Sequence, residues 1–143
     1  MQNQKSWYLL FSCWLVALIS MAGSLFFSDV MEFPPCSMCW YQRIAMYPLV
    51  FIFLGGLFPL DTSVIKFSFP LVIVGWLFAT WHNLLHYEIV PETATPCREG
   101  VSCSTVYLDY GFITIPFLSW VAFSMIAVML FLLYKENKKN KEV

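Results

Sequence analysis

The chain alternates between long apolar runs and short polar segments. Apolar residues fill positions 7–27, 44–58, 67–87 and 115–134. A helix needs roughly 20 apolar residues to cross about 30 Å of hydrocarbon, and three of the runs approach that length. The second run is shorter, so we expect its helix to include residues from position 42. Such runs must be helical, because a bilayer has no water to satisfy the backbone polar groups.

The pattern predicts an all-α membrane protein, a single integral-membrane domain over 1–143 that folds as an up-down-up-down bundle of four transmembrane helices. The composition agrees, since 59% of the residues are hydrophobic and only 12% are charged, whereas soluble domains carry about a quarter charged residues. Too little polar chain remains to cover these runs as a soluble core. We expect helices at roughly 7–27, 42–58, 67–87 and 115–134, loops at 28–41 and 88–114, and a tail at 135–143.

The positive charges predict the orientation of the bundle. The lysines are Lys5, Lys66 and four residues after position 134, whereas the other two connections carry only Arg43 and Arg98. Short loops rich in lysine and arginine stay in the cytoplasm. Both termini and the middle loop are therefore expected to be cytoplasmic, and the loops 28–41 and 88–114 to face outward.

The first apolar run also admits a second interpretation, as a cleaved signal peptide. Lys5, an apolar stretch and the small residues of Ser20-Met21-Ala22 fit the general pattern of such a peptide. The run continues past that point through Phe27. We therefore favour a retained transmembrane helix.

Four of the five cysteines lie in the two outer loops, as the pairs Cys36/Cys39 and Cys97/Cys103. An outward-facing loop can keep a disulfide, whereas cytosolic thiols are held reduced. A Cys-x-x-Cys pair can close a disulfide, and a helix N-terminus lowers the pKa of a thiol that lies there. We expect the second helix to begin near Cys39, which makes Cys39 the favoured thiolate.

A bridge between Cys97 and Cys103 would close a small ring, which adds only modest stability. The pair is therefore better suited to redox chemistry than to stapling. One alternative is a zinc site formed by all four cysteines, but structural zinc sites favour gaps of two to four residues and this gap is five. Two purely structural disulfides are the other alternative. We expect no metal.

Arg43 and His82 are the candidates for binding an electron acceptor. Arg43 follows Cys39 by one helical turn, and an arginine at a membrane edge is a functional candidate or a snorkelling lipid contact; its position does not choose between them. His82 and His86 are spaced i, i+4 near the outer end of the third helix, and the role of His86 is left unassigned. Cys13, inside the first run, is expected to be a small buried hydrophobe.

Residues 35–43, Pro-Cys-Ser-Met-Cys-Trp-Tyr-Gln-Arg, resemble the Cys-x-x-Cys-x-x-x-Arg signature of the DsbB family of disulfide-bond formation proteins, and the short second pair is most similar to the BdbC branch. The likeness covers nearly the whole chain. It implies an oxidoreductase of the bacterial cytoplasmic membrane that reoxidises an extracytoplasmic thioredoxin-like thiol oxidase (DsbA/BdbD-like). The electrons would pass to a membrane quinone, menaquinone or ubiquinone. No nucleic-acid partner is expected.

The resemblance also implies a role for each cysteine. Cys97 would be attacked by the partner's thiolate, and Cys103 would then attack Cys36. This attack would release Cys39 as a thiolate facing the quinone, with Arg43 and His82 beside it.

Two other functions remain as alternatives. A four-helix reductase of the vitamin K epoxide type would use similar chemistry, but such reductases place their cysteine pairs differently along the helices. The second alternative is a non-enzymatic four-helix membrane scaffold whose outer loops are stapled by disulfides or zinc.

Overall fold

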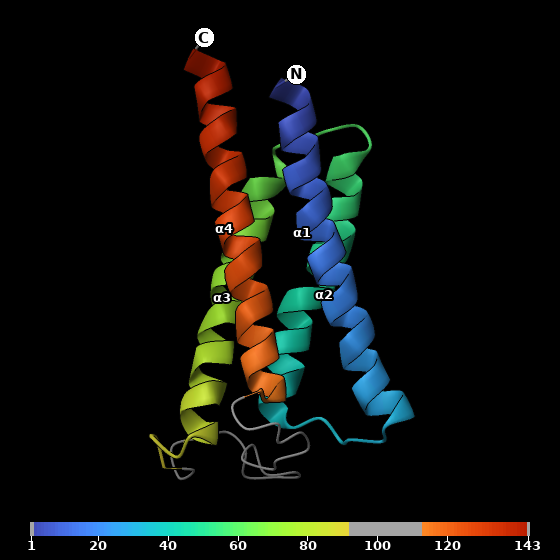
Figure 1. The fold of residues 1–143 in the computed structure, drawn as a ribbon, viewed down its shortest axis with the longest axis vertical. Helices are drawn as coiled ribbons and strands as arrows, with labels where there is room; N and C mark the ends of the chain where they lie inside the picture. Colours follow the sequence, from blue (N-terminus) through green and yellow to red (C-terminus); the bar gives the residue numbers. More distant parts are fainter. Residues whose placement is uncertain (1, 92–112, 143) are drawn as a thin grey trace.

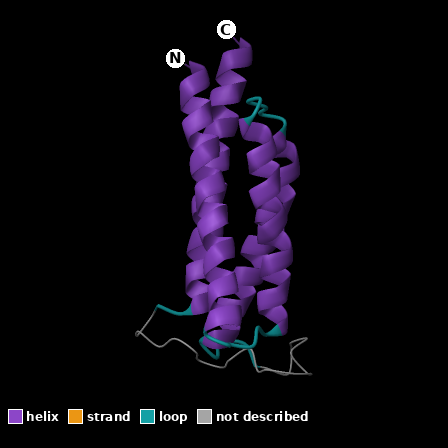
Figure 2. Cartoon of the chain, turned by 90° about the vertical axis from the view of Figure 1, so that its right-hand side faces the viewer, coloured by secondary structure: helices purple, strands orange, loops and turns teal. Residues whose placement is uncertain are grey.

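The computed structural model describes residues 2–91 and 113–142 of the chain. These residues form a bundle of four long helices that run along one axis, with the connections at the two ends (Figures 1 and 2). The helices are α1 (Gln2–Leu25), α2 (Ser37–Leu57), α3 (Val64–His86) and α4 (Ile115–Glu142), and α1 continues into a short π-helix, η1 (Phe26–Val30).

The helices are arranged so that α1 and α3 each pack against both α2 and α4. One end of the bundle holds the two termini and the turn between α2 and α3 (Figure 1). The other end holds the connection 31–36, the end of α3 and the start of α4. The chain thus passes up and down the bundle, as predicted.

Among the described residues, three helical segments are long and apolar enough to cross a membrane: Gln4–Val30, Val64–His86 and Ile115–Glu142. The fourth helix, α2, packs beside them. The protein is therefore an all-helical membrane bundle.

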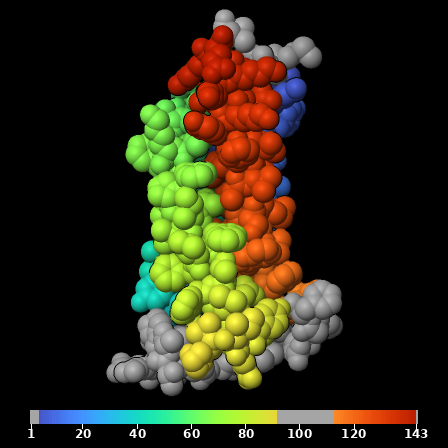
Figure 3. Space-filling model, turned by 90° about the vertical axis from the view of Figure 1, so that its left-hand side faces the viewer, coloured from blue at the N-terminus to red at the C-terminus, as the bar shows by residue number. Residues whose placement is uncertain are grey.

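The outer surface carries large apolar side chains, as a lipid-facing surface should. Figure 3 shows the face formed by α3 and α4, which run side by side. Phe67 on α3 is 66% exposed and Phe131 on α4 is 60% exposed. Water would penalise so many exposed apolar groups, whereas lipid chains accommodate them.

The interior of the bundle is filled by apolar side chains from all four helices, from alanine to the rings of Phe53 and Phe123. Cys13 of α1 is completely buried in this core, which confirms its predicted place as a small apolar residue. Gly75 of α3 lets the ring of Phe123 on α4 occupy the space where a Cβ would stand. The two helices can therefore approach closely at this level.

The helix ends differ from the predicted bounds. The helix α4 runs to Glu142, so the predicted tail 135–143 is helical as far as that residue. Its last turn is polar and carries an i, i+4 ion pair between Lys138 and Glu142 at 3.8 Å. An apolar run predicts only the part of a helix that lies in the lipid. A polar extension of the same helix outside the lipid is not predicted by it. For the same reason α1 already begins at Gln2.

The first outer connection is shorter than the predicted loop 28–41, because η1 extends to Val30 and α2 begins at Ser37. Proline disfavours helical geometry in the residue before it, so Pro34 and Pro35 delay the start of α2 until Cys36. Most of the second predicted loop, 88–114, lies outside the described residues.

Candidate functional site

The Cys-x-x-Cys pair occupies the first turn of α2. Cys36 is the N-cap residue of this helix, with extended backbone angles (φ −73°, ψ 170°). Its sulfur accepts a hydrogen bond from the backbone N–H of Cys39 at 3.4 Å, the bond that a polar N-cap side chain normally makes. The helix therefore begins two residues before the predicted start near Cys39, at Ser37, and the N-cap place belongs to Cys36.

The two sulfur atoms lie close together in their reduced form. Cys36 Sγ and Cys39 Sγ are 2.9 Å apart. Cys36 is buried and Cys39 is partly buried. A disulfide requires a separation of about 2.05 Å, so a small movement of the side chains is enough to close the pair.

A buried chain of polar groups connects α2 to α3 behind the dithiol. His82 Nε2 lies 3.8 Å from Cys36 Sγ, and His82 Nδ1 lies 3.0 Å from Gln42 Nε2. An amide nitrogen can only donate a hydrogen bond, so Nδ1 accepts and Nε2 carries the ring proton. His82 therefore directs its N–H toward the Cys36 sulfur.

These contacts favour a thiolate at Cys36. The pKa of the Cys36 thiol is lowered from its ordinary value, first by a hydrogen bond with the Cys39 thiol and then by His82, against the opposing effect of burial. In the reduced pair, these interactions thus favour negative charge on Cys36, with the Cys39 thiol as its hydrogen-bond donor.

His82→Leu is expected to raise the pKa of Cys36, because it removes one of the interactions that favour the thiolate. The pKa can be followed as the pH at which the rate of Cys36 alkylation rises, in a protein with Cys97→Ser and Cys103→Ser. His86→Leu is the matched control, because the His86 ring packs on Tyr87 and makes no contact with the dithiol. Equal pKa values in the two variants would contradict this interpretation.

Arg43 lies one turn beyond Cys39 and is held in place by α1. Its Nη2 donates a hydrogen bond to the backbone carbonyl of Ser24 at 2.9 Å, and its guanidinium lies 5.4 Å from the centre of the Trp40 ring. Tyr47 Oη donates to the Ser24 hydroxyl at 3.4 Å. A guanidinium has five N–H donors, so the Ser24 carbonyl engages only part of its capacity.

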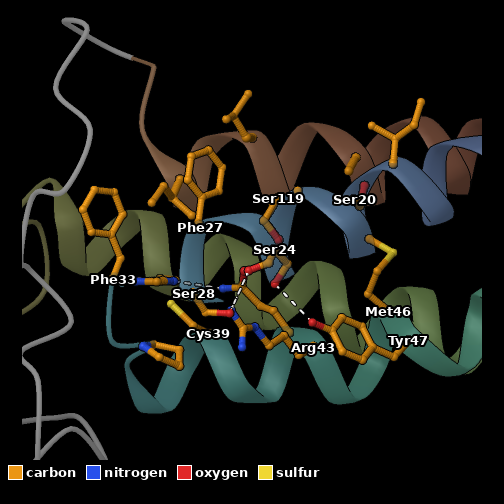
Figure 4. A pocket seen from close by; sticks show the side chains of 18 of the residues that line it. Ser20, Ser24, Phe27, Ser28, Phe33, Cys39, Arg43, Met46, Tyr47 and Ser119 are labelled. Atoms are coloured by element: carbon orange, nitrogen blue, oxygen red, sulfur yellow. Dashed lines mark hydrogen bonds between the residues drawn. The ribbon is translucent and has the colours of Figure 1, made fainter. Parts of the chain in front are cut away.

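A cavity of about 360 Å³ lies beside these residues, between α1, α2 and α4, with His82 of α3 in its wall. Figure 4 shows Cys39, Arg43 and Tyr47 around it, with Arg43 and Tyr47 both bonded to Ser24. The lining is mainly apolar, with a few polar groups, which is the usual character of a small-molecule site.

The structure brings four of the predicted site residues together. Cys36 and Cys39 contact each other, Cys36 contacts His82, and Cys39, Arg43 and His82 line the same cavity. Cys97 and Cys103 lie outside the described residues. His86 does not line the cavity.

Three residues of the site were not found from the sequence. Gln42, which orients His82, follows Cys39 by three residues and so belongs to the same helix face. Its polarity within an apolar helix was the available signal. Ser24 and Tyr47 gave only the weak signal of polar groups in long apolar runs.

Comparison with known proteins shows which family this chain resembles. The model of the family "Disulfide bond formation protein DsbB" matches residues 4–134. "Disulfide bond formation protein C" of Bacillus subtilis is 44% identical over 131 residues, which cover 91% of this chain and 95% of that protein. "Probable disulfide formation protein" of Oceanobacillus iheyensis is 41% identical, covering 96% and 97%. No solved structure matches the chain.

The family match covers most of the chain, and the relatives align along nearly their full length. A reduced Cys-x-x-Cys pair at one end of a membrane bundle fits the chemistry that their names describe. This protein belongs to the DsbB family of disulfide bond formation proteins, membrane thiol–disulfide oxidoreductases that generate disulfide bonds.

Proposed function

We propose that this protein reoxidises an extracytoplasmic thioredoxin-like thiol oxidase and passes the electrons to a membrane quinone, menaquinone or ubiquinone. The observation that carries the proposal is the shared cavity, where the reduced dithiol meets a buried histidine and a fixed arginine within a membrane bundle. A structural scaffold with stapled loops has no need of such a cavity.

The residues present fit a quinone. A flat apolar ring with two carbonyl oxygens suits a mainly apolar cavity that offers a few hydrogen-bond donors, and 360 Å³ falls within the usual range of ligand sites. Arg43 would hold one of the oxygens through its remaining donors, and His82 also lines the cavity. A bound quinone would supply a two-electron acceptor that is soluble in lipid.

The steps before the acceptor are thiol–disulfide exchanges, in which a thiolate attacks one sulfur of a disulfide and releases the other. The partner's dithiol would be oxidised at the Cys97–Cys103 disulfide, with attack on Cys97. Cys103 would then attack Cys36 in the Cys36–Cys39 disulfide and release Cys39 as a thiolate. Cys97 and Cys103 fall in the sequence between α3 and α4, and the end of α3 and the start of α4 lie at the same end of the bundle as the start of α2.

We propose that this end faces outward across the bacterial cytoplasmic membrane, with both termini inside. The support is the distribution of charge. Lys5, Lys66 and the polar end of α4 lie at the end opposite the dithiol, and positive charge is retained on the cytoplasmic side.

The proposal is tested with the purified protein in detergent, a reduced thioredoxin-like partner and a quinone. The redox state of the cysteines and the reduction of the quinone are measured together. We expect one quinone to be reduced for each partner dithiol oxidised. Oxidation of the partner without quinone reduction would contradict the proposed acceptor.

Thiol labelling in cells separates the enzyme from a stapled scaffold. When quinone is depleted, the enzyme should accumulate free thiols at Cys36 and Cys39. A scaffold would stay fully oxidised under the same conditions.

A further inference from the structure

The reduced site gathers three metal-ligating atoms around one point. The donor atoms of Cys36, Cys39 and His82 all lie within 4.8 Å of one another. Thiolate and imidazole are the ligands that zinc and other thiophilic d¹⁰ cations prefer. A Cys₂His set with a fourth, open position is itself a known zinc arrangement.

We propose that the reduced dithiol centre binds a thiophilic d¹⁰ cation such as Zn²⁺, through Cys36, Cys39 and His82, and that the bound cation keeps the protein reduced. The cation would inhibit reoxidation of the dithiol and would not be a resident cofactor. Binding itself requires neither quinone nor partner; only the inhibition rests on the function proposed above.

The positions of the donors need little adjustment. With Zn–S near 2.3 Å and Zn–N near 2.0 Å in a tetrahedral site, two sulfurs would lie about 3.8 Å apart, and a sulfur and a nitrogen about 3.5 Å apart. His82 Nε2 already lies 3.8 Å from Cys36 Sγ. The sulfurs, at 2.9 Å, would have to separate by about 1 Å, and Cys39 is the less buried of the two.

Charge and hydrogen bonding also favour the cation. Two thiolates neutralise its double charge, which limits the cost of placing it in buried surroundings. A ligating histidine normally donates its other ring N–H to an acceptor. Gln42 can provide that acceptor, because its side-chain nitrogen already lies 3.0 Å from Nδ1 of His82. A half-turn of the amide would put the oxygen Oε1 in the place of that nitrogen.

Binding is an exchange of protons and moves no electrons. Each protonated thiol loses its proton to solvent as its sulfur becomes a thiolate ligand, and the ring proton of His82 moves from Nε2, which binds the cation, to Nδ1. The oxidised pair has no thiolate to offer and cannot bind in this way. Conversely, two sulfurs engaged by the cation cannot join as a disulfide until it leaves.

The test titrates Cd²⁺ into the full chain in detergent and follows the ultraviolet absorbance of cadmium–thiolate bonds. Cys97→Ser and Cys103→Ser remove the second pair, and Zn²⁺ is then used to displace Cd²⁺. We expect one Cd²⁺ per reduced chain and none per oxidised chain. His82→Ala should weaken binding by at least about tenfold, and Gln42→Leu by about ten- to a hundredfold.

Two controls make the result specific. His86→Ala and Cys13→Ser should bind Cd²⁺ like the parent, because neither residue contacts the dithiol. The proposal fails if His82→Ala and His86→Ala bind equally well, or if Cys36→Ser keeps the parent affinity. The two proposals fail separately: a protein that reduces quinone but binds no cation overturns only this inference, and one that binds the cation but never reduces quinone overturns only the function.

Discussion

Replacing Cys39 by serine is expected to abolish quinone reduction driven by the reduced partner. Cys39 lines the cavity beside Arg43, and the proposed route releases this sulfur as the thiolate that faces the acceptor. A serine oxygen cannot form or leave a disulfide. Cys36 is the disulfide partner of Cys39 and cannot also replace it, and Cys13 is buried in the core. We expect the rate of quinone reduction to fall by at least about three orders of magnitude.

The matched control is Cys13→Ser, which changes the same atom far from the cavity and should retain the rate of quinone reduction. A single exchange with the partner should also survive in Cys39→Ser, because Cys97 and Cys103 are unchanged. Quench-flow thiol trapping would detect that exchange. Steady quinone reduction by Cys39→Ser would overturn the proposed mechanism.

Arg43→Ala is expected to weaken quinone use while the Cys97–Cys103 disulfide still exchanges with the partner. A hydrogen bond from a charged group contributes about 1.5–3 kcal/mol, which corresponds to roughly ten- to a hundredfold in affinity. The loss should appear as a raised apparent KM for quinone. The measurement is the initial rate of quinone reduction over a range of quinone concentrations.

Arg43→Lys separates charge from shape, because lysine keeps the charge but lacks the rigid fork of donors. We expect an intermediate KM. Lys66→Ala removes a cation at the opposite end of the bundle and should leave the KM unchanged. If Arg43→Ala has the parent KM, the arginine is a lipid-facing contact and not a ligand of the acceptor.

The fold was predictable because lipid demands long apolar helices. The runs at 7–27, 67–87 and 115–134 fall within α1 and η1, α3 and α4, apart from Tyr87 at the end of the second of these runs. The helix ends were not predictable from apolarity alone. The last turn of α4 is made of lysine, glutamate and asparagine, which are polar and do not extend the apolar run.

The site was predictable where it depends on local spacing. Cys36 and Cys39 lie at the first turn of α2 and Arg43 on the next turn, so their separation along the chain fixes their separation in space. The contact between His82 and Cys36 depends instead on how α3 packs against α2, and the sequence could only suggest it. The sequence favoured Cys39 as the thiolate because it placed the start of α2 a few residues too late, whereas the hydrogen bonds of the reduced pair favour Cys36.

The first two turns of α2 also divide the site into a rigid part and an adjustable part. The spacing of Cys39 and Arg43 belongs to one helix and would survive any shift in how the bundle packs. His82 comes from α3, so a slide of α3 along α2 would withdraw its N–H and leave the sulfur and the guanidinium in register. The hydrogen bond to the dithiol therefore depends on how α3 packs against α2, whereas the spacing of Cys39 and Arg43 depends on α2 alone.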